Sequence, residues 1–343
     1  MGAQTVDGGV DPDAGNCYGG GLITACFETV PTGALTLAPA SIINTDTDEK
    51  CSPTTNNVAA CVIAAESITV PSSYVAATGS RPLVLVATQT ISVNAVLTVG
   101  SSRMYAFVGA GSDMPGCNAG VAPTGTSGGA GGSFGGVGGA GAAVGTAGMP
   151  GAAITATSLR GGCSGQTGAD AVAPTGPGEK GRGGGAIYLI AETSITVAST
   201  GSINASGGAA GGGATGTASG GGGGGSGGLI GLDSPMLMIA GQVFANGGGG
   251  GEASGAQSTG SPGGDALNAT TAAAGGAGGT SFGTDGGDGS VGSQLAGQAA
   301  DPSCTGTCTT PTAGGGGGGG AGIIKRYRAT SVSGGGPISP PAT

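Results

Sequence analysis

The sequence predicts an all-β protein, a right-handed parallel β-helix (solenoid) of about five to six coils with long glycine-rich insertions. Three observations lead to this fold class. Short apolar runs recur along the chain with nearly the same internal spacing. Glycine accounts for 85 of the 343 residues. No segment has the apolar periodicity of an amphipathic helix.

The glycine content excludes most other fold classes. Average usage is about 7%, and glycine contributes no side chain to a core while losing the most backbone entropy on folding. Collagen requires glycine at every third residue, and runs such as GGGGGGG at 314–320 break that pattern. A wholly disordered chain would combine low hydropathy with high charge, whereas mean hydropathy is +0.22 and only 8% of the residues are charged.

The apolar runs define the coil repeat. Residues 83–93 (LVLVATQTISV) and 187–197 (IYLIAETSITV) carry apolar residues at identical spacing, and residues 61–70 and 230–239 match with one residue fewer in the middle. Alternation with a period of two places these side chains on one face of a strand. A single coil cannot bury that face alone, so the runs are expected to stack as parallel strands around a shared interior.

A second short strand is expected after each run. Its inward positions are predicted four and six residues after the run ends, or two residues later in the copy at 187–205. The predicted inward pairs are Tyr74 and Ala76, Leu97 and Val99, Val243 and Ala245, Ser41 and Ile43, and Ile203 and Ala205.

The repeats and glycine runs divide the chain into segments. These are an acidic Gly/Pro tether (1–16), N-terminal coils (17–108), a coil at 184–205, a coil at 229–246, a closing strand and tail (322–343), and glycine-rich insertions at 109–183, 206–228 and 247–321.

The insertions allow two interpretations. Residues 128–152 follow a rough GGx triplet pattern, which suits left-handed extended helices with three residues per turn that pack side by side. Flexible linker is the other interpretation. Both remain open for 109–160, and a flexible loop is favoured for 252–312, where Ser, Thr and Ala interrupt the triplets.

Eight cysteines are candidates for disulfides: Cys17, Cys26, Cys51, Cys61, Cys117, Cys163, Cys304 and Cys308. An even number in a loop-rich chain indicates a disulfide set and an oxidising compartment. A zinc site is disfavoured because no Cys-x-x-Cys pair is present. Local closure favours pairing each cysteine with its neighbour in the chain, although the sequence leaves the connectivity open.

Charge limits the partners and the chemistry. A net charge of −9 argues against a basic stripe for nucleic acid. Lys325, Arg326 and Arg328 are interpreted as protective charges on a terminal edge strand rather than as a binding patch. The chain has no histidine, which excludes Ser-His-Asp triads and imidazole metal ligands.

Targeting signals are not evident in the sequence. No apolar segment reaches the roughly 18 residues of a membrane span, and no secretory signal is recognised at the start. A surface protein would therefore have its signal or anchor missing from this chain.

Acidic clusters resemble fragments of calcium loops. They lack the spacing of a complete site, so solvated turn aspartates are the favoured interpretation, and no metal or cofactor is expected. The clusters are Asp7, Asp11 and Asp13; Asp46, Asp48 and Glu49; and Asp285 and Asp288.

The stretch GGGAIYLIAETSITVASTGSINASGG at 183–208 places a coil between glycine clusters. This arrangement resembles glycine-rich bacterial surface and secreted proteins, which are adhesin-like and thread parallel β-helix rungs between polyglycine runs. The glycine segments also resemble those of phage tail-fibre adhesin tips, which pack polyglycine helices. The resemblance covers about residues 20–330. It implies a fold and a surface location and carries over no catalytic residue.

Two functions follow as hypotheses. The first is a non-catalytic structural or adhesive protein, extracellular or on a cell surface, whose partner is a surface polymer, a glycan or a second copy. The alternative is a carbohydrate-active β-helix enzyme, a polysaccharide lyase or glycosidase. A glycosidase generally needs two facing carboxylates. Glu66, Glu192 and Asp233 lie at coil corners, and the matching positions of Glu66 and Glu192 favour a structural role.

Overall fold

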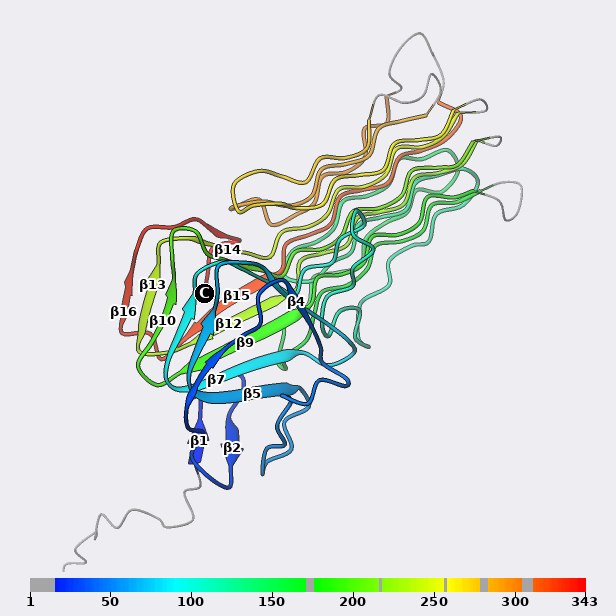
Figure 1. The fold of residues 1–343 in the computed structure, drawn as a ribbon. Coiled ribbons are helices and arrows are strands. Elements are labelled where there is room, and N and C mark those ends of the chain that lie inside the picture. Colours follow the sequence, from blue (N-terminus) through cyan, green and yellow to red (C-terminus); the bar gives the residue numbers. More distant parts are fainter. Residues whose placement is uncertain (1–15, 171–175, 216–217, 256–257, 278–282, 304–310) are drawn as a thin grey trace, which may run out of the picture.

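The computed structural model describes residues 16–170, 176–215, 218–255, 258–277, 283–303 and 311–343. Within these ranges the protein is all-β and contains no helix (Figure 1). An antiparallel hairpin, β1 (Asn16–Tyr18) and β2 (Ala25–Phe27), precedes two parallel sheets. The larger sheet consists of β3 (Ala34–Thr36), β5 (Cys61–Val70), β7 (Leu83–Val93), β9 (Ala186–Ala191), β10 (Ser194–Val197), β12 (Leu229–Asp233), β13 (Met236–Ile239), β15 (Ile323–Tyr327) and β16 (Ser331–Ser333). The smaller sheet consists of β4 (Ser41–Asn44), β6 (Val75–Thr78), β8 (Val96–Thr98), β11 (Ser202–Asn204), β14 (Gln242–Phe244) and β17 (Ile338–Ser339).

Strand order in both sheets follows the sequence. The smaller sheet runs β17-β14-β11-β8-β6-β4. In the larger sheet, β15, β12 and β9 follow one another to the first half of β7, and β16, β13 and β10 follow one another to its second half. On the other side of β7 lies β5, and β3 pairs with β5. Each repeat therefore contributes one continuous or divided strand to the larger sheet and one short strand to the smaller sheet. We call each such unit a rung. The described rungs span 34–44, 61–78, 83–98, 186–204, 229–244 and 323–339.

The predicted alignment of the apolar runs is confirmed. Leu83 pairs with Ile187 and Val93 pairs with Val197 in parallel register. The shorter run in β5 is accommodated by a bulge between Ala65 and Ser67. Alternate Leu, Ile, Val and Ala side chains from both sheets form one buried core between them. The interior is therefore the shared apolar space that the repeat predicts.

One prediction for the second strand is wrong. Tyr74 is exposed and Ala76, although buried, is not part of the main core, to which Val75 and Ala77 belong instead. The Pro71–Tyr74 connection takes one more residue than the turns after Leu37, Val93 and Ile239, and a shift of one residue exchanges the two faces of a strand. The other four predicted pairs keep their register, since Leu97, Val243 and Ile203 are core residues and Ser41 pairs with Val75.

The first half of β7 and all of β9 and β12 are buried on both faces. Val84, Val86, Tyr188 and Ile190 point away from the main core into a second apolar cluster. The β1–β2 hairpin covers this cluster with Phe27 and other apolar residues. Two-sided burial explains why these segments are apolar at most positions, whereas in the strands that follow, β10 and β13, buried residues alternate with partly or fully exposed ones.

The glycine-rich segments form a hydrogen-bonded bundle that projects from one side of the sheets (Figure 1). We call the described parts of 119–185, 206–228 and 246–322 the glycine bundle. Backbone N–H groups of residues 220–228 donate in rotation to three different neighbouring segments. Residues 220, 223 and 226 donate to 163–169, residues 221, 224 and 227 donate to 314–320, and residues 222, 225 and 228 donate to 205–211.

Neighbours therefore surround this segment instead of lying in one plane. Gly129 donates to Gly221, Gly221 to Gly314, and Gly317 to Gly129, which closes a triangle of three segments. The period of three residues fits the triplet pattern of the sequence. Glycine is required where segments touch, because a Cβ atom on Gly223 would overlap the carbonyl oxygen of Ala130.

The flexible loop expected for 252–312 is not found in the described part of that range. Gly276 donates to Gly250, Gly287 to Gly316, and Gln298 to Asp288, so these residues belong to the bundle. Larger side chains can point outward from the bundle, as Leu267 does. The interruption of the triplets by such residues therefore did not indicate a loop.

Three disulfides join Cys17 to Cys26, Cys51 to Cys61, and Cys117 to Cys163. These are the pairs expected from local closure. Cys304 and Cys308 lie outside the described residues. Disulfides are typical of oxidising, non-cytoplasmic compartments.

Candidate functional site

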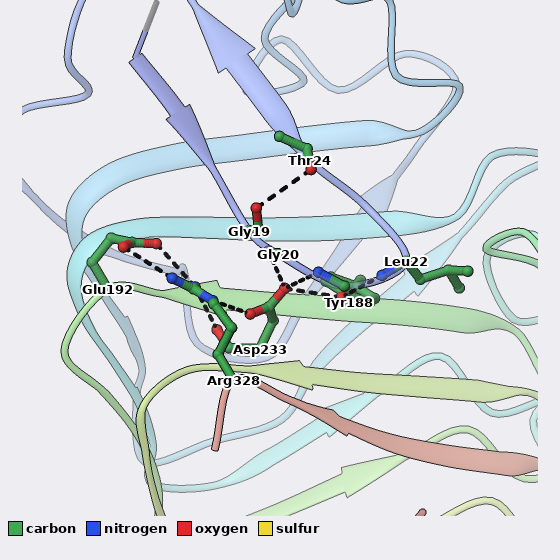
Figure 2. A network of polar contacts seen from close by, with 9 residues as sticks. Gly19, Gly20, Leu22, Thr24, Tyr188, Glu192, Asp233 and Arg328 are labelled. Carbon is green, nitrogen blue, oxygen red and sulfur yellow. Dashed lines mark hydrogen bonds and ion pairs between the residues drawn. The ribbon is translucent and has the colours of Figure 1, made fainter. Parts of the chain in front are cut away.

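A buried carboxylate, Asp233, lies at the end of β12 and joins a network of charged and polar groups. The Asp233 side chain is 0% exposed. Its Oδ2 atom accepts hydrogen bonds from Gly20 N (2.9 Å), Gly21 N (3.1 Å) and the Tyr188 hydroxyl (3.0 Å), and its Oδ1 atom accepts one from Arg328 Nε. Figure 2 shows this carboxylate between the glycine loop and the arginine. Residues more than 200 positions apart in the chain therefore meet at one carboxylate.

Arg328 connects Asp233 to a second carboxylate. Its Nη1 atom donates a hydrogen bond to Glu192 Oε2 at 3.0 Å, and its Nη2 atom lies 2.9 Å from Glu192 Oε1 as an ion pair. Nη2 also donates to the Asp233 carbonyl oxygen at 3.3 Å. Arg328 follows β15 in a left-handed backbone conformation with φ of 55°, which is uncommon for residues other than glycine.

Small residues allow the segments to approach. A Cβ atom on Gly21 would overlap the Tyr327 ring and the Tyr188 hydroxyl, and one on Gly231 would overlap the Tyr188 ring. Gly231 is paired with Tyr188 in the sheet, so the phenol ring lies across β12 beside Asp233. The Tyr188 oxygen in turn accepts a hydrogen bond from Leu22 N (3.0 Å).

The protonation states favour a structural role. Burial, and then the charge of Asp233, raise the pKa of Tyr188, so the phenol stays protonated and donates its hydrogen bond. Burial would lower the pKa of Arg328, but its hydrogen bonds and charge interactions with Glu192 and Asp233 more than offset this and raise it. Both oxygens of Asp233 are occupied by donors. The network is therefore suited to fasten the residue 19–22 loop to β9, β12 and the residue after β15.

The structure changes the interpretation of the basic run IKRYRA. Lys325 and Arg326 lie on β15, at the edge of the larger sheet, as expected of protective charges. Arg328 instead turns toward Asp233 and Glu192. The C-terminal Thr343 pairs with the β15 backbone through Arg326 N and Ile324 O.

Glu66 takes no part in this network. It accepts a hydrogen bond from Gln89 Nε2 at 2.6 Å. Glu192 is bound to Arg328 on a later rung. The three carboxylates considered for a carbohydrate-active enzyme are thus each paired, and only Glu192 and Asp233 share a partner.

Asp46 and Asp48 lie in the turn region after β4, as expected, whereas Asp288 lies within the glycine bundle. Asp46 accepts hydrogen bonds from Ser80 Oγ (2.7 Å) and Ser80 N (2.9 Å), and these lower the pKa of its carboxyl. Asp48 pairs with Lys50 at 3.4 Å, and Asp288 accepts from Gly275 N at 2.8 Å. Asp7, Asp11 and Asp13 lie outside the described residues. Across the described ranges, the clusters of Asp46 and Asp288 included, no group of three acidic or cysteine side chains is arranged to hold a metal ion.

A cavity of about 230 Å³ lies where the glycine bundle meets the sheets. Arg103, Lys180 and Arg182 line it. Arg103 pairs with Glu179 at 3.6 Å and Arg182 pairs with Asp113 at 3.5 Å. Two of the three cations at this cavity are therefore already balanced by carboxylates.

A buried arginine at the base of the bundle was not predicted. Arg160 is 8% exposed and donates to the carbonyl oxygens of Met114 and Pro115, each at 3.0 Å. Its guanidinium lies 5.7 Å from the centre of the Phe134 ring, and burial lowers its pKa. It stands beside the Cys117–Cys163 disulfide, where it supports the base of the bundle. Only its isolation in an uncharged stretch could have drawn attention to it.

Comparison with known proteins gave no match among family models, curated proteins or solved structures. Within the described residues, no helix has the length and apolar character of a membrane span.

Proposed function

We propose that this protein is a non-catalytic structural or adhesive protein of an extracellular or cell-surface location. In this proposal the rungs form a right-handed parallel β-helix, and the glycine bundle consists of packed polyglycine II helices. The bundle is the contact surface that the solenoid presents to a surface polymer, a glycan or a second copy.

The observation that carries the proposal is the bonding of residues 220–228 to three surrounding segments. A body built from backbone hydrogen bonds needs almost no side-chain core, and this one projects from the sheets (Figure 1). Three disulfides support an oxidising location. The pairing of Glu192 and Asp233 with Arg328 supports a structural role for the carboxylates that an enzyme would need.

The test combines location and adhesion. Surface proteolysis and fractionation of the producing cells should find the chain outside the cytoplasm. Microspheres coated with the full chain should adhere to those cells more strongly than albumin-coated microspheres. Retention only in the cytoplasm, or adhesion equal to that of albumin, would overturn the proposal.

Two matched variants address the contact surface. Val121 and Leu267 are exposed on the glycine bundle, and Val96 is exposed on the smaller sheet. Replacing Val121 and Leu267 with Glu should reduce adhesion, while Val96→Glu should leave it unchanged. Loss of adhesion only in Val96→Glu would move the contact surface away from the bundle.

A further inference from the structure

An ordered array of hydroxyl groups covers the outer face of one part of the larger sheet. This part consists of β3, the second halves of β5 and β7, and the strands β10, β13 and β16. Parallel register places the outward residues of successive rungs in two columns. The first column is Ala34, Ser67, Thr90, Ser194, Met236 and Ser331, and the second is Thr36, Thr69, Ser92, Thr196, Met238 and Ser333. Nine of these twelve positions are Ser or Thr. We call these two columns the hydroxyl array.

The array has a fixed geometry. Neighbouring parallel strands lie about 4.8 Å apart, and alternate residues of a strand lie about 6.6 Å apart. Beneath the columns, Ile68, Ile91 and Ile195 are buried in the core and hold each strand in place. The Thr side chains are restricted at χ1 because they are β-branched. The sheet therefore sets the spacing of all nine hydroxyl-bearing residues, and the four threonines among them also have restricted side-chain rotamers.

The hydroxyl groups are available for binding. Within the described part of the chain, none of the nine makes a hydrogen bond to another protein group. The face also lies away from the glycine bundle, since β10, β13 and β16 stand on the opposite side of the sheets (Figure 1). The bundle therefore leaves this face open.

The composition of the array indicates which kind of partner it can bind. No position is charged or aromatic, so neither an ionic surface nor stacking on a ring is favoured. Each hydroxyl both donates and accepts hydrogen bonds, and a partner that fits all of them must do the same at regularly repeated points. Water in a crystal lattice meets this description. A polysaccharide would also present C–H faces, for which the array offers no ring.

From this geometry we infer that the hydroxyl array binds the surface of crystalline water, that is, ice. The inference rests on the proposed adhesive role and names the material to which this second face adheres. The fixed backbone of the sheet and the restricted rotamers of its threonines favour such binding, because less conformational entropy is lost on contact.

The fifth rung interrupts the array and provides a test. Met236 and Met238 are 42% and 47% exposed and occupy the columns of Ser194 and Thr196. Because methionine is longer than threonine and lacks a hydroxyl, this rung should limit contact with a flat lattice. Replacing both residues with Thr should extend the array and strengthen ice binding.

The experiment measures enrichment of the full-length protein in slowly growing ice relative to the remaining liquid. The unaltered chain should be enriched compared with albumin. Thr90→Tyr combined with Thr196→Tyr should abolish the enrichment, and Val96→Tyr on the smaller sheet should preserve it. The double Met→Thr variant should increase it. Circular dichroism of each variant establishes that the sheets are intact.

Several results would overturn the inference. These are exclusion of the unaltered chain from ice, enrichment that survives in the Thr90 and Thr196 variant while its sheets are intact, and equal loss in Val96→Tyr. Binding to insoluble cellulose or chitin that is lost in the Thr variant would assign the face to a glycan instead. If the chain is excluded from ice but coated microspheres still adhere to cells, the inference fails and the proposed function stands.

Discussion

Asp233 illustrates how the fold accommodates a charge without solvent. A buried carboxylate is costly unless donors and an opposite charge surround it. Here two backbone N–H groups, a phenol and a guanidinium occupy its oxygens. The donors come from the N-terminal loop, β9 and the residue after β15, so one residue fastens together distant parts of the chain.

Asp233→Asn should therefore destabilise the protein. The substitution removes a buried charge from Arg328, which is itself partly exposed, so we expect a loss of about 2–4 kcal/mol in the free energy of unfolding. Denaturant titration measures this loss. The control is Glu179→Gln, because Glu179 pairs with Arg103 at an exposed site, where the expected change is about 0–1 kcal/mol. Equal midpoints for the two variants would contradict the network.

The sequence could not have predicted this network. Asp233 was recognisable as a corner residue, but its partners Gly20, Tyr188 and Arg328 are separated from it by 45 to 213 positions. No local pattern connects residues at such distances. Lys325 and Arg326 lie on β15, whereas Arg328 is the first residue after the strand. The direction of the Arg328 side chain toward Asp233 therefore depends on the turn after β15, which the basic run alone does not indicate.

The glycine segments show the same dependence at the scale of an element. Residues 220–228 contact three other segments, and their glycines stand where backbones touch. The triplet pattern of 128–152 indicated the local conformation. The identity of the neighbours is a long-range property, which is why the described part of 252–312 was expected to be loop. Strand alignment was predictable because the apolar spacing repeats, and it failed only at Tyr74, where a turn gained one residue.

A pair of glycine substitutions tests the packing within the bundle. A Cβ atom on Gly223 would overlap the Ala130 carbonyl oxygen, so Gly223→Ala should destabilise the protein by about 1–3 kcal/mol through overpacking. A Cβ atom on Gly264 would lie 3.4 Å from its nearest neighbours. Gly264→Ala should therefore be neutral or stabilise by up to about 1 kcal/mol, because it restricts the unfolded chain. Thermal unfolding that gives both variants the same midpoint would refute backbone contact at Gly223.

At the scale of the whole molecule, the glycine bundle and the sheets are continuous. Gly185 donates to Val99, Gly228 to Ala205, and Gly322 to Ala245, each at 2.7 Å, just before β9, β12 and β15 begin. The rungs therefore set the spacing at which the glycine segments leave the sheets. The bundle in turn depends on rungs that are far apart in the sequence. We infer that both parts unfold together.

Amide hydrogen exchange of the full chain tests this coupling. Peptides covering 220–228 and 314–322 should be protected to the same degree as β9, because their N–H groups are hydrogen-bonded within the bundle. Exchange at the rate of an unfolded chain in these peptides would instead indicate flexible linkers.

The Cys117–Cys163 disulfide spans 46 positions, and in the chain-entropy model a cross-link of this span stabilises the folded protein by about 4 kcal/mol. Replacing both cysteines with Ser should therefore accelerate exchange first in 119–170, whereas the same change at Cys17 and Cys26 should act on the β1–β2 hairpin.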